Sequence, residues 1–505
     1  MSGSTFSAAH TNSAAAVRLP LVQAIGFAGH GAVLDESKSR ALIEELLKER
    51  KAAAQGIVYA ITSIAAGAAL LFAESCLELQ IPLRVLLPAP QATFKEHLDP
   101  FIWPRVEKVL AQAMSVAVAA NHELRDEGYY ECFVETVQHS QLLIALWDDQ
   151  SLTGADATGE IVQLARQTGR PVIQIHSGTG AVGIVDGRAG AQVHDDSELQ
   201  FLNDLPDADV TLAERTPIEL ARAWFQKIDA NASRFAPEVR RMAAIPIVFT
   251  AIAALISGAA ARNPDAPAWL GASAAMGIFA AALPAALKLR QRQVMWIRTR
   301  TAAEVCRSVL ALWPVPGLYE VIGAEAISEF SGLLRSLNFL KMLHGSAASA
   351  SLDEFKAQYR RDRLINQIDY FSIQSKRSQR AGRNLKWLAL LGVAFAVFSV
   401  AWWLGAKAVL GSNHPVPGGR WLPLVISALF QLATISGALA VVYDCERRQR
   451  RYSDLGGRLQ FWDAEFAALR TWASVLKVVN RVERALLVEM LEWRSLAGNT
   501  RLPRK

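Results

Sequence analysis

Three short loops in the first third of the sequence carry the residues best suited to holding an anionic small molecule. They are GFAGH at Gly26–His30, SIAAGA at Ser63–Ala68 and DDQSLTGADATGE at Asp148–Glu160. Small residues let a main chain approach a ligand closely, and the third loop ends where a predicted helix begins, so that the helix N–H groups favour an anion. Each loop by itself is more typical of a tight turn, and only the three together indicate a site. The expected ligand-binding residues are Gly26, Phe27, Ala28, Gly29, His30, Ser63, Ala66, Gly67, Asp148, Thr158, Gly159 and Glu160.

The elements that must position these loops are short apolar strands that alternate with helices. The predicted strands are Leu21–Phe27, Ile57–Ile61, Leu83–Leu87, Val116–Ala119, Leu142–Trp147 and Val172–His176. The predicted helices are Glu36–Gln55, Leu70–Leu79, Phe101–Met114, Tyr129–His139 and Thr158–Thr168. This alternation predicts an α/β, Rossmann-like, doubly wound parallel sheet over residues 21–180. Residues 1–20 are predicted to be a disordered tail without a signal peptide. Residues 181–230 are predicted to form a linker and a helix, and the Gly-rich run SGTGAVG is assigned to this connection because no helix follows it.

Four apolar stretches in the second half are each about 20 residues long, the length that crosses about 30 Å of hydrocarbon. They are Met242–Ala260, Pro267–Leu287, Trp387–Leu410 and Leu422–Tyr443. Basic side chains flank the two pairs on the side away from the short connectors: Arg240, Arg241, Lys288, Arg290, Arg292, Lys376, Arg377, Arg380, Arg383, Lys386, Arg447, Arg448, Arg450 and Arg451. The positive-inside rule therefore predicts an all-α membrane region with four transmembrane helices in two hairpins and both termini cytoplasmic, in the inner (cytoplasmic) membrane.

The net charge of +6 also allows a nucleic-acid patch, but each basic run abuts an apolar stretch, so no nucleic-acid partner is expected. The four cysteines have no metal-ligand spacing and are expected to be reduced, and no metal or cofactor is predicted. No Asp, Glu, Lys or Arg lies at mid-depth in the four stretches, which disfavours ion-coupled transport. Apolar residues from Leu455 to Trp493 recur every three or four positions and predict one long amphipathic helix. Packing within the chain and self-association remain alternatives for that helix, and a homo-oligomer is expected.

The order of the three loops resembles that of the SLOG superfamily, the Rossmann-like group that includes the DprA and LOG proteins. GFAGH is similar to the first ligand loop, AITSIAAGA to the second and ATGE to the third, over roughly residues 20–180. The resemblance implies a nucleotide or nucleotide-derived ligand, with His30 near a phosphate and Asp148 or Glu160 on a ribose hydroxyl. Ala68 stands where many relatives carry an acidic residue, and ATGE lacks the Pro-Gly-Gly segment of the phosphoribohydrolase branch. Both differences favour binding over catalysis, and Glu160 is the catalytic candidate only if the protein is an enzyme.

The second half resembles SLATT domains, two-span effector modules found with SLOG domains in bacterial conflict systems. YRRDRLINQIDYFSIQSKRSQR and ERRQRRYSDL carry this similarity, and WIRTRTAAEVCRS is a weaker copy. We therefore expect two such modules, at residues 231–345 and 346–505. The resemblance implies a membrane-anchored nucleotide sensor whose membrane helices rearrange or assemble in an antiviral defence system. A membrane-anchored phosphoribohydrolase-like or NAD-processing enzyme and a structural scaffold with a degenerate head are the alternatives.

Overall fold

The computed structural model describes residues 16–31, 33–64, 67–118, 126–148, 158–185, 196–207, 216–262, 268–286, 289–315, 329–344, 351–410 and 421–496. These residues form two compact units. The first unit combines Met1–Lys227 with Leu312–Ser349, and the second combines Ile228–Ala311 with Ala350–Lys505. The chain therefore leaves the first unit, returns to it and leaves it again.

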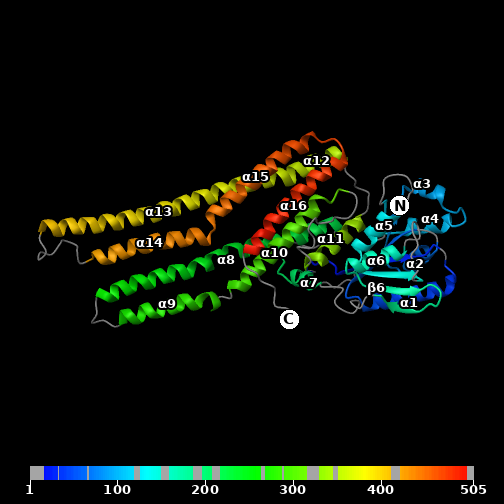
Figure 1. Cartoon of the computed structure of the whole chain (residues 1–505), viewed down its shortest axis with the longest axis horizontal. Coiled ribbons are helices and arrows are strands. Elements are labelled where there is room, and N and C mark those ends of the chain that lie inside the picture. Colours follow the sequence, from blue (N-terminus) through cyan, green and yellow to red (C-terminus); the bar gives the residue numbers. More distant parts are fainter. Residues whose placement is uncertain are drawn as a thin grey trace. The chain divides into compact units, whose positions relative to one another are not determined.

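A seven-stranded, mostly parallel sheet forms the centre of the first unit (Figure 1). Its strands are β1 (Val22–Gly29), β2 (Ile57–Ser63), β3 (Leu83–Leu87), β4 (Ser115–Val118), β5 (Leu142–Trp147), β6 (Val172–His176) and β7 (Val182–Ile184). The spatial order is β4-β3-β2-β1-β5-β6-β7, and only β7 is antiparallel to its neighbour. The six predicted strands are confirmed, and β1 and β5 are buried along most of their length, as expected for strands covered on both faces.

The run SGTGAVG is part of this sheet and is not a free connector. Its first residues form the turn after β6, and its last two, Val182 and Gly183, begin β7. Gly180 has a φ of +75° there, a conformation that glycine adopts without a steric penalty. The glycines of this run therefore serve a β-hairpin.

The sheet separates two apolar cores. On one face, α1 (Glu36–Ala53), α2 (Ala68–Glu78) and α4 (Trp103–Gln112) pack through residues such as Ile43, Phe72 and Val106. On the other face, α5 (Asp126–His139) and α6 (Thr158–Gln167) pack through residues such as Val137 and Ile161. The short α3 (Gln91–His97) and α7 (Ser197–Asn203) complete the helices before residue 204.

Helix α11 (Ser331–His344) belongs to this unit although it follows the first apolar hairpin in the chain. Phe339 and Met342 share a buried cluster with β1–β3, and the Phe339 and Tyr59 rings lie 5.7 Å apart. Arg335 donates to the main-chain oxygen of Val22 at 3.3 Å and pairs with Asp196 at 2.7 Å. The structure thus divides the chain differently from the expected 231–345 module, because the apolar residues of α11 cover the sheet of the first unit. This first unit is called the head below.

Residues 16–20 are ordered, whereas the sequence predicts them in the tail; residues 1–15 lie outside the described ranges. Val17 and Leu19 are buried, and Leu19 exchanges two hydrogen bonds with the Asn203 side chain. Lys227, in the first part of α8 (Pro217–Arg262), donates to the main-chain oxygens of Val17 and Asn203. Trp224 also donates to Asn203 at 2.8 Å. The start of α8 is therefore fixed to the head by buried hydrogen bonds.

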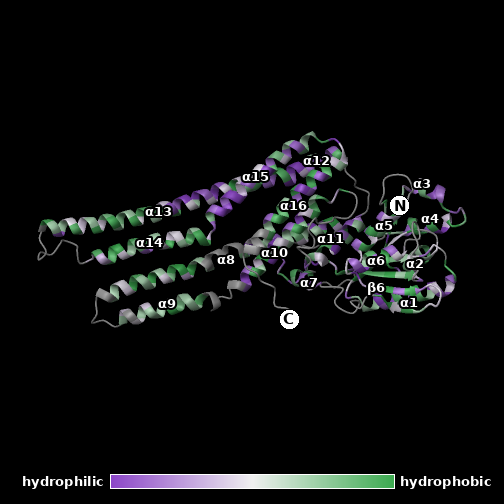
Figure 2. Ribbon diagram, viewed as in Figure 1, coloured by the Kyte–Doolittle hydropathy of each residue, from purple (hydrophilic) through white to green (hydrophobic). Residues whose placement is uncertain are grey.

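The second unit is all-helical. Its elements are α8 after Lys227, α9 (Ala268–Ala286), α10 (Leu289–Ala311), α12 (Leu352–Tyr359), a π-helical turn η4 (Arg360–Ile365), α13 (Asn366–Leu410), α14 (Leu422–Val442), α15 (Cys445–Ala468) and α16 (Trp472–Leu496). Figure 2 shows mainly hydrophobic colouring along α14 and along the last part of α13, whereas the first part of α13 is hydrophilic. The helical runs Leu352–Val409 and Leu422–Ala468 are long and apolar enough to cross a membrane. Only 11% and 6% of the most apolar 18-residue segment of each run is buried. Two shorter apolar helical segments accompany them, Ala244–Ala260 and Gly271–Leu283.

The predicted long C-terminal amphipathic helix is two helices. The chain breaks at Leu469–Thr471, and α16 starts behind Thr471, whose side chain accepts from the Ser474 N–H at 3.3 Å. A threonine side chain that accepts from the N–H three residues later is a helix N-cap and marks the start of a new helix. The apolar periodicity continues through this position and therefore predicts one helix where the structure has two. The two helices pack against each other, and their buried residues include Leu459, Phe466 and Val479.

Candidate functional site

The topological switch point of the sheet lies between β1 and β5. The chain continues from β1 to β2 on one side, whereas β5 pairs with β1 on the other. Ligands of open α/β sheets bind at the carboxyl ends of strands at such a point. The residues that directly follow these two strands are His30 and Asp148. Two of the three predicted loops therefore start at the position where this fold class places a ligand.

His30 and Asp148 are hydrogen-bonded to each other. The distance from His30 Nε2 to Asp148 Oδ1 is 2.9 Å, and the two side chains are 9% and 31% exposed. Because an ionised carboxylate only accepts, the ring nitrogen donates in this contact. The His30 main-chain N–H also donates to the Leu146 oxygen at 3.4 Å, which holds the loop against β5. The pair offers ring N–H and carboxylate oxygen atoms, and can therefore hold a phosphate oxygen or a hydroxyl group.

The second loop closes directly onto the first. Gly67 has a φ of +84°, and a Cβ there would lie 2.1 Å from the Gly31 oxygen. The Ala68 N–H donates to the His30 oxygen at 3.1 Å, so the start of α2 lies on the loop after β1. A Cβ on Gly29 would meet that of Ala68 at 2.6 Å. Glycine is required at both positions because the two chain segments approach so closely.

The other residues predicted in the first two loops lie at or in the core. Phe27 is 1% exposed and stacks on Phe72 with ring centroids 4.4 Å apart. Ala28 and Ser63 are buried, and a Cβ on Gly26 would meet the Ser140 side chain at 2.8 Å. Ala66 lies outside the described residues. Phe27 and Gly26 therefore shape the base of the site through packing, and the chemistry at its surface rests on the His30–Asp148 pair.

The third predicted loop is described only at its two ends, Asp148 and Thr158–Glu160. Thr158 and Gly159 are buried in the first turn of α6, while Glu160 is exposed. α6 packs on the sheet through Ile161 and Val162. Within the described residues, the Glu160 carboxylate makes no hydrogen bond, and an acidic side chain in a first turn stabilises a helix by about 0.5 kcal/mol through the helix dipole. Glu160 therefore has a structural role that requires no catalysis.

A second group of polar residues, which the sequence did not single out as a site, is buried in the helical unit. Arg363 of η4 is 2% exposed and reaches the carboxylates of Glu304 on α10 and Glu483 on α16. Its Nε and Nη2 atoms donate to the two Glu483 oxygens at 2.9 and 2.6 Å, and Nη2 lies 2.8 Å from Glu304. Tyr359 donates to Glu483 at 2.7 Å, and Ser308 also donates to it. Four donated hydrogen bonds thus converge on one buried carboxylate.

Further ion pairs connect this network to α8. Arg307 pairs with Glu304 and donates to Asp229 at 2.9 Å, and Arg300 donates to Asp229 at 3.3 Å. Burial by itself would raise the pKa of Glu304, but the charges of Arg307, Arg363 and Arg300 outweigh it and lower that pKa to about 2. Burial likewise disfavours the Arg363 charge, yet Glu483 and Glu304 raise its pKa well above the usual value. Glu304 and Arg363 are therefore ionised at neutral pH, and the network joins α8, α10, η4 and α16.

The π-helical turn explains how Arg363 enters the network. A π-turn inserts an extra residue into a helix and re-aims the side chains around it. The run RRDR supplies four consecutive charged residues, of which Arg360 pairs with Asp463, Arg361 with Asp362, and only Arg363 is buried. No periodic pattern separates the buried arginine from its neighbours, and so its role could not be predicted from the sequence.

The chain matches no known family model, and no curated protein sequence matches it.

Proposed function

We propose that this protein is a membrane-embedded sensor whose head binds a nucleotide-derived ligand and whose helical unit responds by rearranging or assembling. The resemblance of the loops to SLOG domains and of the basic helices to SLATT domains is the basis for a nucleotide ligand and for a role in bacterial antiviral defence. The His30–Asp148 pair at the switch point supports ligand binding, because it offers a hydrogen-bond donor and an acceptor where α/β sheets bind ligands. The apolar helices are little buried within the protein, which supports their insertion into a membrane.

In the proposed topology the four apolar stretches cross the inner membrane as two hairpins, α8–α9 and α13–α14. The segments Ala244–Ala260 and Gly271–Leu283 are shorter than a standard span, and the four-span arrangement is part of this proposal. The basic residues that flank the hairpins favour cytoplasmic termini. Alkaline phosphatase fusions tested at both termini and at residue 264 check this, with activity expected only at the short connector.

The connectivity of the chain is the observation that carries the proposed coupling. The start of α8 is hydrogen-bonded into the head through Trp224 and Lys227, and the chain returns to the head in α11 after the first apolar hairpin. The hairpin is therefore connected to the unit that holds the ligand site through α8 at one end and through α10 at the other. α8 is also a single helix of 46 residues, about 69 Å long at 1.5 Å per residue. A ligand that favours one arrangement of the head thus shifts the anchors of the hairpin together.

The proposal is tested with the full-length protein in liposomes loaded with a self-quenching dye. Nucleotides and cyclic oligonucleotides are screened first for a rise in melting temperature, and each ligand that binds is then added to the liposomes. We expect ligand-dependent dye release that is lost in His30→Ala and Asp148→Asn but kept in His97→Ala, whose side chain is exposed on α3. Measured binding without release by any ligand would reject the effector function.

A further inference from the structure

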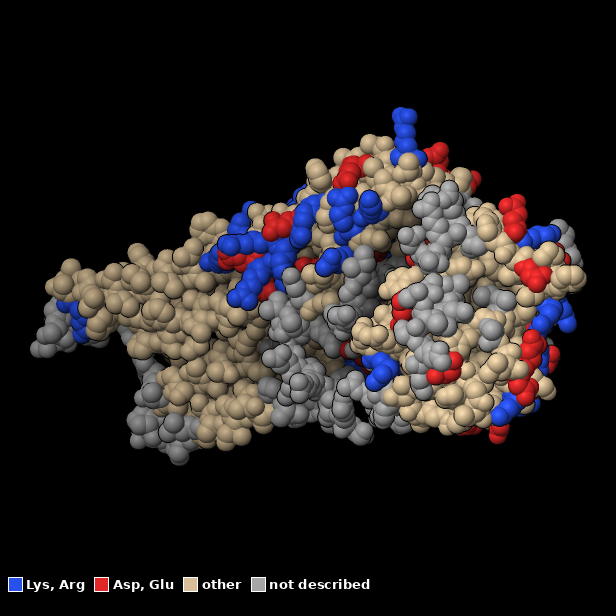
Figure 3. All heavy atoms as spheres, turned by 45° about the vertical axis from the view of Figure 1, so that its right-hand side comes forward, with Lys and Arg blue, Asp and Glu red and all other residues tan. Residues whose placement is uncertain are grey.

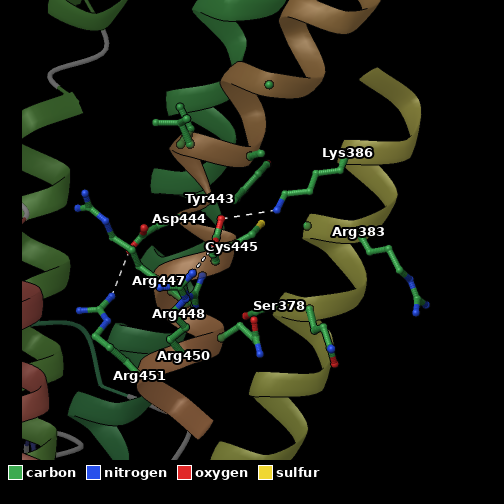
Figure 4. Close-up of a pocket in the computed structure, with 18 of the residues that line it drawn as sticks. Ser378, Arg383, Lys386, Tyr443, Asp444, Cys445, Arg447, Arg448, Arg450 and Arg451 are labelled. Atoms are coloured by element: carbon green, nitrogen blue, oxygen red, sulfur yellow. Dashed lines mark hydrogen bonds and ion pairs between the residues drawn. The ribbon is translucent and has the colours of Figure 1, made fainter. Parts of the chain in front are cut away.

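A groove of about 1290 Å³ lies at the base of the second apolar hairpin (Figure 4). It is lined by α13 from Ser378 to Leu390, by the end of α14 and the start of α15 from Gly437 to Arg451, and by Gln293 and Trp296 of α10. All of these residues belong to the helical unit.

A break between α14 and α15 shapes this groove. α14 ends at Val442, and Asp444 has a φ of +46°, in the left-handed region, before α15 starts at Cys445. This conformation costs a non-glycine residue about 1–2 kcal/mol, although aspartate tolerates it better than most. Just beyond the break the helices approach closely, because a Cβ on Gly382 of α13 would lie 3.2 Å from that of Cys445.

One half of the groove is strongly cationic. Six basic side chains line it against two acidic ones: Arg383, Lys386, Arg447, Arg448, Arg450 and Arg451 against Asp444 and Glu446. Glu446 pairs with Lys386 at 3.6 Å and Arg450 at 2.7 Å, and Asp444 pairs with Arg451 at 3.2 Å. Arg383 and Arg447 are exposed and make no ion pair within the described residues. Figure 3 shows Lys and Arg gathered where the uncharged surface of the helical unit ends.

The other half of the groove is apolar and continues onto the hairpin. Trp387, Leu390 and Val441 line it and are 60%, 60% and 78% exposed. The same groove thus offers cationic side chains at one end and an open apolar surface at the other. A soluble anion matches only the first half, and an uncharged lipid matches only the second.

We propose that this groove binds an anionic phospholipid, with its phosphate at the cationic end of the groove and its acyl chains along α13 and α14. The proposal rests on the proposed membrane insertion of these two helices. Basic residues near a span attract anionic lipid in general, but a groove that is cationic at one end and apolar at the other gives the lipid a defined position. Trp296 and Arg448 also line a cavity of about 120 Å³ that contains Arg300 and Glu304. The lipid would therefore bind next to the buried charge network.

The test uses the full-length protein in detergent and native mass spectrometry, titrated with phosphatidylglycerol or phosphatidylcholine. Arg383→Gln/Arg447→Gln removes two charges from the groove, and Lys376→Gln/Arg377→Gln removes two charges from an exposed part of α13 that does not line it. At about 1 kcal/mol per basic residue, we expect the first variant to weaken phosphatidylglycerol binding about 10- to 30-fold. The second variant should change it less than about twofold, and Arg383→Lys/Arg447→Lys should retain most of the binding.

Three results would overturn the lipid site. They are equal binding of the two lipids by the unsubstituted protein, equal weakening by both Gln variants, and displacement of the lipid by excess inorganic phosphate, which would indicate a site for a free anion. An unchanged melting temperature of the groove variant checks that it is folded. Extraction of membranes at alkaline pH separates the two proposals: release of the protein would reject membrane insertion, whereas retention with any of the three results would reject the lipid site alone.

Discussion

Replacing Glu483 by glutamine should strongly destabilise the helical unit. Glu483 is 4% exposed and accepts from Arg363 Nε and Nη2, Tyr359 and Ser308. The amide retains the shape but turns one acceptor oxygen into a donor that faces other donors, and it leaves the Arg363 charge with Glu304 as its remaining partner. Breaking a buried ion pair from one side costs about 3–5 kcal/mol. At about 2–4 °C per kcal/mol for a unit of this size, the melting temperature should fall by roughly 6–20 °C.

The assay is thermal unfolding of the full-length protein in detergent, followed by tryptophan fluorescence. Glu465→Gln is the matched control, because Glu465 pairs with Arg481 at a partly exposed position and such pairs contribute about 0–1 kcal/mol. A double-mutant cycle adds a second check. Arg363→Met combined with Glu483→Leu should destabilise less than the sum of the single changes, because no buried charge of this pair is then left alone. Equal melting temperatures for Glu483→Gln and Glu465→Gln would refute the assignment of the network as the tie between these helices.

Three further predictions follow from single residues. The pKa of Glu304 is lowered from 4.5 to about 2, so its ionised form contributes about 3 kcal/mol to the free energy of unfolding. This contribution is present above pH 4.5 and is lost as the pH falls toward 2. Glu304→Gln should therefore flatten the decline in melting temperature between pH 5 and pH 3. Gly67→Ala should destabilise the head by about 2–4 kcal/mol in thermal unfolding, since its φ is positive and a carbonyl oxygen blocks the Cβ, while Gly183→Ala, with nothing within 4 Å, should be nearly neutral. Glu160→Gln should leave ligand binding, measured by calorimetry, and dye release unchanged; a loss of nucleotide turnover in this variant would favour the enzyme alternative instead.

The sequence by itself determined the local features of this protein. Alternating apolar strands and helices predicted six strands of a parallel sheet, because a strand buried on both faces needs a continuous apolar run wherever it lies in the sheet. The loops that follow β1 and β5 could be placed at the same edge of the sheet, because the carboxyl ends of parallel strands lie at one edge. The long apolar helices α13 and α14 were equally evident, since hydropathy depends on the composition of one segment. Thr471 shows the limit of this approach. It caps the start of a new helix, although the apolar periodicity of the sequence continues through it.

Only the tertiary structure decided which distant segments meet. It assigned α11 to the head sheet, brought Glu304, Arg363 and Glu483 to one buried point, and paired His30 with Asp148. These pairings depend on which helix faces turn toward each other, and the charged residues involved belong to runs whose other members are exposed. Burial of a charge is tolerated only where partners from other elements supply the hydrogen bonds that water would have made. That condition is a property of the assembled helices, and no segment of the sequence contains it alone.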